Sequence, residues 1–135
     1  MKERGLTIIG VAFFLVVLAV ACSFNVSTAK VKDAYMAREV NGVPEKTTTF
    51  GQDDPFYCIV DLSNAPDDTS LKAAWYAADV EGIEPDFFID EAEIVHGDGE
   101  ITFDLVPDSF WPPGTFRVDL FLNGEMERSL EFQVQ

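Results

Sequence analysis

The sequence predicts an all-β fold, in which about seven short antiparallel strands form two sheets packed face to face. Three observations lead to this prediction. From residue 29 onward, apolar residues recur with a period of two, which is the period of a strand. Turn residues such as Asn, Gly and Pro separate the runs, and no long amphipathic helix interrupts them. Apolar residues make up 47% of the chain, which is enough for a packed core.

The expected strands follow one another along the chain in short, regularly spaced runs. The strongest runs cover residues 55–62, 70–79, 100–105, 115–122 and 126–134. Weaker runs cover residues 31–38 and 86–95, and residues 47–50 are a candidate for a short additional strand. In each strong run, alternate apolar side chains are expected to face the opposite sheet. For the last run the expected inward residues are Met126, Leu130, Phe132 and Val134.

Trp75 is expected to lie at the centre of the core. It sits on the run 70–79, one strand after Cys58, which is about where an immunoglobulin-type sandwich keeps its central tryptophan. The second cysteine of such domains is missing from the run 115–122. The sheets must therefore be held together by packing, to which each large buried aromatic contributes about 2–3 kcal/mol.

The amino terminus has the pattern of an export signal. Lys2 and Arg4 precede an uncharged, mostly apolar run that ends at Cys22, so residues 1–22 are expected to form a signal peptide or membrane-anchor helix. Three outcomes stay open. Residues 19–21 fit an A-x-A cleavage site, Cys22 could be lipidated although Ala19 replaces the preferred Leu, or the helix could stay and span the membrane.

All three outcomes place the remainder of the chain outside the cytoplasm, in the periplasm or at the cell surface. The expected organisation is residues 1–22 as signal or anchor, residues 23–46 as linker and first strand, and residues 47–135 as the sandwich, whose first strand begins near residue 30. We predict a membrane-anchored domain, held either by a lipidated Cys22 or by a retained helix.

The net charge limits the partners of this domain. Asp and Glu number 24 against 9 Lys and Arg, for a formal charge of −15, and the basic residues form no cluster. Such a surface repels phosphate backbones and anionic lipid headgroups, so nucleic acid is excluded as a partner. We expect a protein partner in the membrane or at the cell surface.

Residues suited to catalysis are sparse, and no enzyme is expected. His96 is the only histidine, which excludes a multi-histidine metal site, and it flanks a Gly-Asp-Gly turn typical of an exposed hairpin. Cys58 lies inside a strand and is expected to be a buried, unreactive thiol, since no Lys or His lies near it in sequence. A disulfide to Cys22 would require Cys22 to be unlipidated and outside the membrane.

Calcium is the one cofactor that stays open, because loops at one end of a sandwich can supply several oxygens. Acidic segments occur at residues 51–55, 66–70 and 81–91, but none matches an EF-hand loop. No metal site is assigned, and a solvated acidic surface is the simpler interpretation.

The run 110–124, FWPPGTFRVDLFLNG, combines a proline-rich turn, a strand and an Asn-Gly hairpin turn. It resembles the last hairpin of bacterial, surface-anchored Ig-like sandwich domains. The matching residues are Trp111, Pro112, Gly114, Phe116, Val118, Asn123, Gly124, Phe132 and Val134. These domains have no established activity, so the resemblance implies architecture and location and carries over no site residues.

Two aromatic side chains are expected to point away from the core. If Trp75 faces inward, Tyr76 faces outward, and the same alternation turns Phe121 outward. In an Ig-like strand order both lie on one sheet, with Lys72 and Arg117 nearby, which suggests a docking face. Alternatively, they are isolated surface aromatics or are covered by residues 30–46.

Trp111 and its neighbour Phe110 are expected to plug one end of the sandwich, with a ligand-contacting loop as the alternative. Trp111 is therefore also a candidate partner-binding residue. The leading functional prediction is a non-catalytic domain that binds another protein or supports a membrane complex. The alternative is a module that binds a small ligand or a carbohydrate, with or without calcium, and an enzyme of unrecognised type ranks third.

Overall fold

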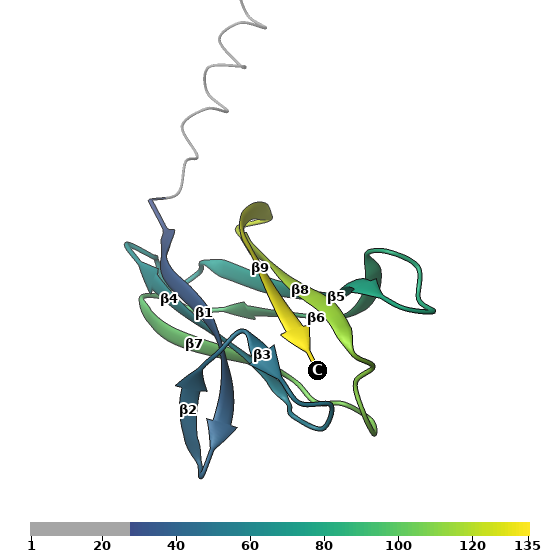
Figure 1. Cartoon of the computed structure of the whole chain (residues 1–135). Coiled ribbons are helices and arrows are strands. Elements are labelled where there is room, and N and C mark those ends of the chain that lie inside the picture. The colour runs from purple at the N-terminus through teal and green to yellow at the C-terminus, as the bar shows by residue number, and fades with distance from the viewer. Residues whose placement is uncertain (1–27) are drawn as a thin grey trace, which may run out of the picture.

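The computed structural model describes residues 28–135, so the expected signal or anchor helix and Cys22 lie outside the described residues. Among residues 28–135 no helix is long and apolar enough to cross a membrane. The described part is a β-sandwich of two sheets (Figure 1). The strands are β1 (Lys30–Val40), β2 (Val43–Lys46), β3 (Thr49–Phe50), β4 (Phe56–Ser63), β5 (Ser70–Val80), β6 (Phe87–Val95), β7 (Gly99–Leu105), β8 (Gly114–Leu122) and β9 (Glu125–Val134).

One sheet has the strand order β2-β1-β4-β7 and the other has the order β3-β9-β8-β5-β6. In the second sheet, β9, β8 and β5 have the arrangement of the GFC sheet of immunoglobulin domains, with β6 added beside β5 and the short β3 beside β9. The described part thus holds nine strands where about seven were expected. The two short ones differ most from expectation, since β2 was not predicted and β3 pairs in parallel with β9.

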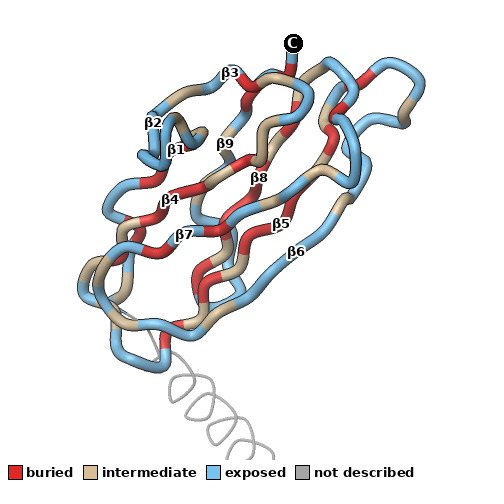
Figure 2. The backbone as a smooth tube through the Cα atoms, turned by 90° about the horizontal axis from the view of Figure 1, so that it is seen from below, coloured by how far each residue is buried: buried red, intermediate tan, exposed pale blue. Residues whose placement is uncertain are grey.

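The predicted period-two faces meet between the sheets as expected. Trp75 is 2% exposed and stacks on Phe56 with ring centroids 6.2 Å apart, while Phe132 meets it edge-on at 6.3 Å. Phe56 and Phe116 are also almost completely buried. Figure 2 shows the buried segments concentrated where the two sheets face each other. The core is an aromatic cluster, which explains how the sandwich can dispense with an inter-sheet disulfide.

Met126 is the clearest error of the sequence prediction, because it is 53% exposed and points outward. The pairing of β8 with β9 shifts by one residue between Leu120, which faces Arg128, and Phe121, which faces Met126. Glu127 is therefore an additional residue in β9, a β-bulge, and it reverses the alternation for every residue before it. Met126 accordingly lies beside the outward Phe121.

Gly114 begins β8 at a place where a side chain does not fit. Its φ is +149°, and a Cβ atom here would lie 2.8 Å from the carbonyl oxygen of Asp79 and 2.8 Å from a methyl carbon of Val80. Glycine adopts this conformation without steric cost. The Pro-Pro-Gly turn therefore lets the backbone of β8 approach the end of β5 closely.

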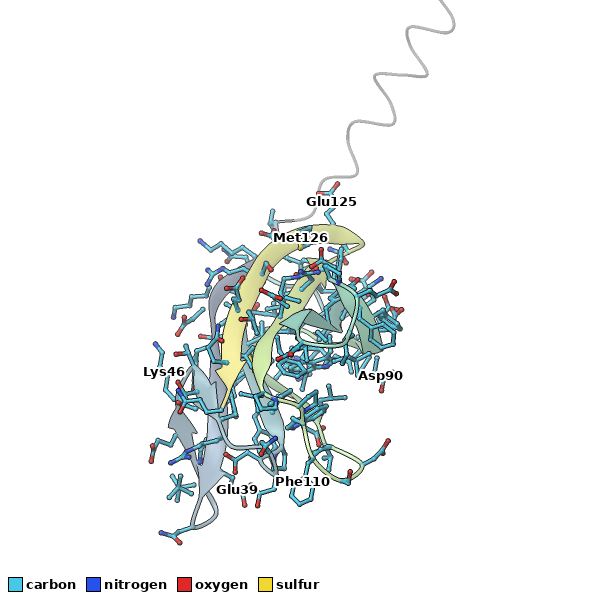
Figure 3. The ribbon with its side chains drawn as sticks, turned by 45° about the vertical axis from the view of Figure 1, so that its right-hand side comes forward. Glu39, Lys46, Asp90, Phe110, Glu125 and Met126 are labelled. Atoms are coloured by element: carbon cyan, nitrogen blue, oxygen red, sulfur yellow. The ribbon has the colours of Figure 1, made fainter. Side chains whose placement is uncertain are left out.

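The two ends of the sandwich differ in what they carry. At the end where the described chain begins lie the turns 64–69, 96–98 and 123–124, and Thr28 Oγ1 donates a hydrogen bond to the Asn64 carbonyl (3.1 Å). The opposite end, which we call the distal end, is formed by the connections 81–86 and 106–113. Figure 3 shows Glu125 and Met126 at the first end and Phe110 at the distal end.

Candidate functional site

The outward side of β9, β8, β5 and β6, called here the outer face, gathers the side chains that the sequence nominated for docking. Strand register arranges them in three cross-strand rows. The first row contains Glu131, Arg117, Tyr76 and Phe88, the second Ser129, Asp119, Ala74 and Glu91, and the third Met126, Phe121, Lys72 and Glu93.

In the first row, two aromatic rings and a guanidinium form one contact group. The guanidinium carbon of Arg117 lies 4.5 Å from the centre of the Tyr76 ring, and the Phe88 ring meets that of Tyr76 edge-on at 5.7 Å. Arg117 also donates to carboxylates of Asp86 and Asp119. The Asp86 hydrogen bond is the main reason that the pKa of Arg117 is raised above its usual value. The cation is thus held over the Tyr76 ring.

In the third row, the ammonium group of Lys72 lies over the ring of Phe121, as the guanidinium of Arg117 lies over that of Tyr76. Its Nζ lies 4.7 Å from the centre of the Phe121 ring and 3.6 Å from a carboxylate oxygen of Glu91. Met126 on β9 is the exposed cross-strand neighbour of Phe121. Tyr76 and Phe121 therefore share one face, as expected from the sequence, but they form separate groups with the second row between them.

The second row supports the first through a buried carboxylate. Asp119 is only 6% exposed, and its Oδ1 accepts hydrogen bonds from Arg117 Nε (3.1 Å) and Ser129 Oγ (2.7 Å). The side chains around a buried carboxylate with two donors are held in place, because moving either donor away would remove one of the two hydrogen bonds that stabilise the buried charge. Asp119 thus holds Arg117 in place over Tyr76.

The alternative that residues 30–46 cover these aromatic side chains is wrong, because β1 and β2 belong to the other sheet. Tyr76, Phe121, Lys72 and Arg117 are all half-buried. The most exposed aromatic of the face is Phe88, at 46%, which the sequence analysis did not single out. The sequence held only part of the signal for it: consecutive phenylalanines at 87 and 88 lie on opposite sides of a strand, but alternation alone does not say which of them faces outward.

The distal end holds a hollow with a volume of about 320 Å³. Its lining is mostly aromatic and aliphatic and includes Ile83, Phe87, Phe110, Trp111 and Pro112. We call it the distal hollow. Asp108 and Ser109 are the polar residues in its wall. A hollow with apolar walls and few polar groups is the usual form of a small-molecule site.

Trp111 and Phe110 were expected to act together, and the structure separates them. Trp111 is 8% exposed, stacks on Phe56 with centroids 4.3 Å apart, and donates from Nε1 to the Asp54 carbonyl (2.8 Å). It closes the end of the core and offers a partner little surface. Phe110 is 70% exposed, so the expectation that it plugs the sandwich is wrong.

Cys58, His96 and the acidic segments were the residues considered for chemistry in the sequence, and all lie within residues 28–135. Burial raises the pKa of the Cys58 thiol to about 12, as fits the expected unreactive cysteine. His96 is exposed and its Nδ1 contacts only the neighbouring Gly97 carbonyl (2.8 Å). Within residues 28–135 no three His, Cys, Asp or Glu side chains come together as metal ligands would, and this includes the acidic segments considered for calcium.

Comparison with known proteins supports the fold and nothing finer. No protein-family model and no curated protein sequence matches the chain. Among solved structures it is similar to an immunoglobulin-like protein of Pseudomonas aeruginosa, with a TM-score of 0.51 and 14% identity over 79% of this chain and 96% of that one. The described part is therefore an Ig-like β-sandwich.

Parts of two larger proteins are also similar. One is the alkylpurine DNA glycosylase AlkC of Pseudomonas fluorescens, with a TM-score of 0.53 and 14% identity over 81% of this chain but 31% of that one. The other is a GH3 β-glucosidase of Bifidobacterium adolescentis, with a TM-score of 0.50 and 11% identity over 79% and 17% respectively. In both, the chain spans less than a third of the relative, so the similarity concerns one domain and not an activity.

Proposed function

We propose that this protein is a non-catalytic, membrane-anchored domain outside the cytoplasm, which binds a partner protein through the outer face of its five-stranded sheet. The observation that carries the proposal is the group formed by Tyr76, Phe88 and Arg117. Aromatic residues and arginine are the side chains most enriched at protein interfaces. Here Asp119 holds the arginine in position, so little side-chain entropy would be lost on binding.

The amino-terminal segment gives the proposal its location. An export signal or anchor at residues 1–22 would hold the sandwich near the membrane and raise its effective concentration there. Intact mass of the protein extracted from membranes tests this part. Full-length mass indicates a retained helix, loss of residues 1–21 with added acyl mass indicates lipidated Cys22, and a soluble cleaved product contradicts the anchor.

The binding part is tested by crosslinking in membranes followed by affinity purification. Phe88→Ala and Tyr76→Ala should each lower the recovery of the partner at least about tenfold, as expected for residues worth more than about 1.4 kcal/mol. The matched control is Val43→Ala, because Val43 is 62% exposed but lies on the other sheet. Equal recovery with all three variants would contradict the proposal.

A second candidate function is the binding of a small ligand or a carbohydrate in the distal hollow. It is favoured by the exposed Phe110 ring at the mouth of an apolar hollow that also offers Asp108 and Ser109. A panel of mono- and oligosaccharides, with and without calcium, should then raise the melting temperature of the protein. Phe110→Ala should abolish that rise, and no rise with any sugar contradicts this candidate.

A further inference from the structure

β6 is the longest strand of the sandwich with an unpaired edge. It lies at the end of the order β3-β9-β8-β5-β6 and pairs only with β5, while all its residues are exposed or half-buried. Figure 2 shows it running along the outside of the molecule. An unpaired edge of nine residues presents a row of backbone donors and acceptors, which other strands can use.

The hydrogen bonds at the start of β5 show which residues of β6 face the open side. The Thr69 carbonyl accepts from His96 N (2.9 Å), whereas the amide and carbonyl of Ser70 bond to Asn123 on the side of β8. Backbone direction alternates along a strand, and the pairing has no irregularity between residues 91 and 95. Val95 is the register partner of Ser70, whose amide and carbonyl point toward β8, so the amide and carbonyl of Val95 point away from β5. By the same alternation, those of Glu91 and Glu93 point away from β5 as well.

The charge of this edge selects among the strands that could pair with it. Asp90, Glu91 and Glu93 are all exposed, and Lys72 lies opposite Glu93 and forms an ion pair with Glu91, which leaves this edge with an excess of acids. A second copy of the chain would bring the same three acids opposite them, and like charges facing each other across strands are destabilising. A segment with basic residues at alternate positions would instead meet opposite charges.

The distal hollow lies at the beginning of the same edge. Phe87 and Ile89 of β6 form part of its wall, and Phe110 stands exposed across from them. A strand added along β6 would place alternate side chains on the inner side of the sheet, in line with Phe87. The last of these side chains would reach the hollow.

We propose that the open edge of β6 binds an extended basic segment of a partner protein, which adds to the sheet as a further strand and inserts an apolar side chain into the distal hollow. This inference rests on the proposed function and names the chemistry of the partner. The main-chain hydrogen bonds supply affinity, and the acids and the hollow supply selectivity.

The test uses the full chain and a synthetic peptide of sequence Lys-Thr-Lys-Thr-Lys-Leu with blocked ends. In NMR titration the amide signals of Glu91 and Glu93 should shift, and their hydrogen exchange should slow. A peptide with glutamates in place of lysines, and one with methylated backbone nitrogens, should bind at least about tenfold more weakly, because they lack the charge or the donors. No binding of the basic peptide, or equal binding of the methylated one, would overturn the inference.

A variant of the protein tests the same geometry from the other side. Glu93→Pro removes an amide that faces the open edge but no backbone hydrogen bond to β5. It also removes one exposed side-chain contact, from Ser70 Oγ to the Glu93 carboxylate (3.0 Å), so the fold should persist while peptide affinity falls about tenfold. Glu125→Lys on β9, which β8 and β5 separate from β6, is the control and should leave affinity unchanged. If Phe88→Ala abolishes capture of the membrane partner while Glu93→Pro affects neither partner nor peptide, the proposed function stands and the edge inference fails.

Discussion

Trp111 and Phe110 are adjacent in sequence and opposite in environment, which makes them a matched pair for testing the structure. Replacing Trp111 with alanine removes a ring stacked on Phe56 and the hydrogen bond to the Asp54 carbonyl. Because the side chain is 8% exposed, the loss should resemble that of other buried aromatics, about 3–5 kcal/mol of unfolding free energy. Phe110→Ala removes a ring that is 70% exposed and should cost less than about 0.5 kcal/mol.

Urea denaturation of the purified full chain, followed by tryptophan fluorescence, measures both effects; Trp75 reports in every variant, together with Trp111 where that residue is retained. The midpoint should fall strongly for Trp111→Ala with an unchanged slope, and should barely move for Phe110→Ala. In a thermal scan the first variant should melt roughly 4 °C lower for each kcal/mol lost. Equal costs for the two variants would refute the assignment of Trp111 to the core and of Phe110 to the surface.

Three further predictions follow from the core and the outer face. Asp119→Ala should lower the free energy of unfolding by about 1–3 kcal/mol in urea denaturation, because Arg117 and Ser129 lose their shared acceptor. An unchanged midpoint would contradict the role of Asp119 as a buried acceptor for both. Gly114→Ala should cost more than about 1 kcal/mol by the same assay, since the added methyl group would meet backbone of β5, and a neutral result would rule out that close approach. Cys58 should resist thiol reagents until the protein unfolds. Burial raises the pKa of the Cys58 thiol to about 12, so the contribution of this thiol to stability is complete below the thiol pKa of the unfolded chain, near 9, and is lost as the pH rises toward 12. The free energy of unfolding should therefore decline between pH 9 and 12 in the native protein, and should decline less in Cys58→Ala.

The outer face shows how far sequence reasoning reaches toward a site. Alternation within β5 and β8 was sufficient to place Tyr76 and Phe121 outward on one sheet. It was not sufficient to find Phe88, because β6 is an exposed edge strand whose apolar residues follow no clean period, and the pairing of β5 with β6 shifts between Trp75 and Tyr76. The contact between Phe88 and Tyr76 depends on that irregularity, which has no signature in composition.

The sequence by itself determined the features that depend on local alternation and on turn chemistry. These are the positions of every strand except β2, the inward side of Trp75, the buried Cys58, the hairpin at Asn123 and the strongly acidic surface. Each is local because a side chain in a strand faces one of two sides, and glycine or asparagine marks where the chain reverses.

Only the tertiary structure decided what depends on register and on contacts between distant segments. The bulge at Glu127 turned Met126 to the solvent, and the separation of Trp111 from Phe110 arose from packing against Phe56. The open edge of β6 is likewise a consequence of strand order. The physical reason is common to all of them. One additional residue reverses the direction of each side chain before it, and hydrogen bonding between strands is fixed by partners far away in the chain.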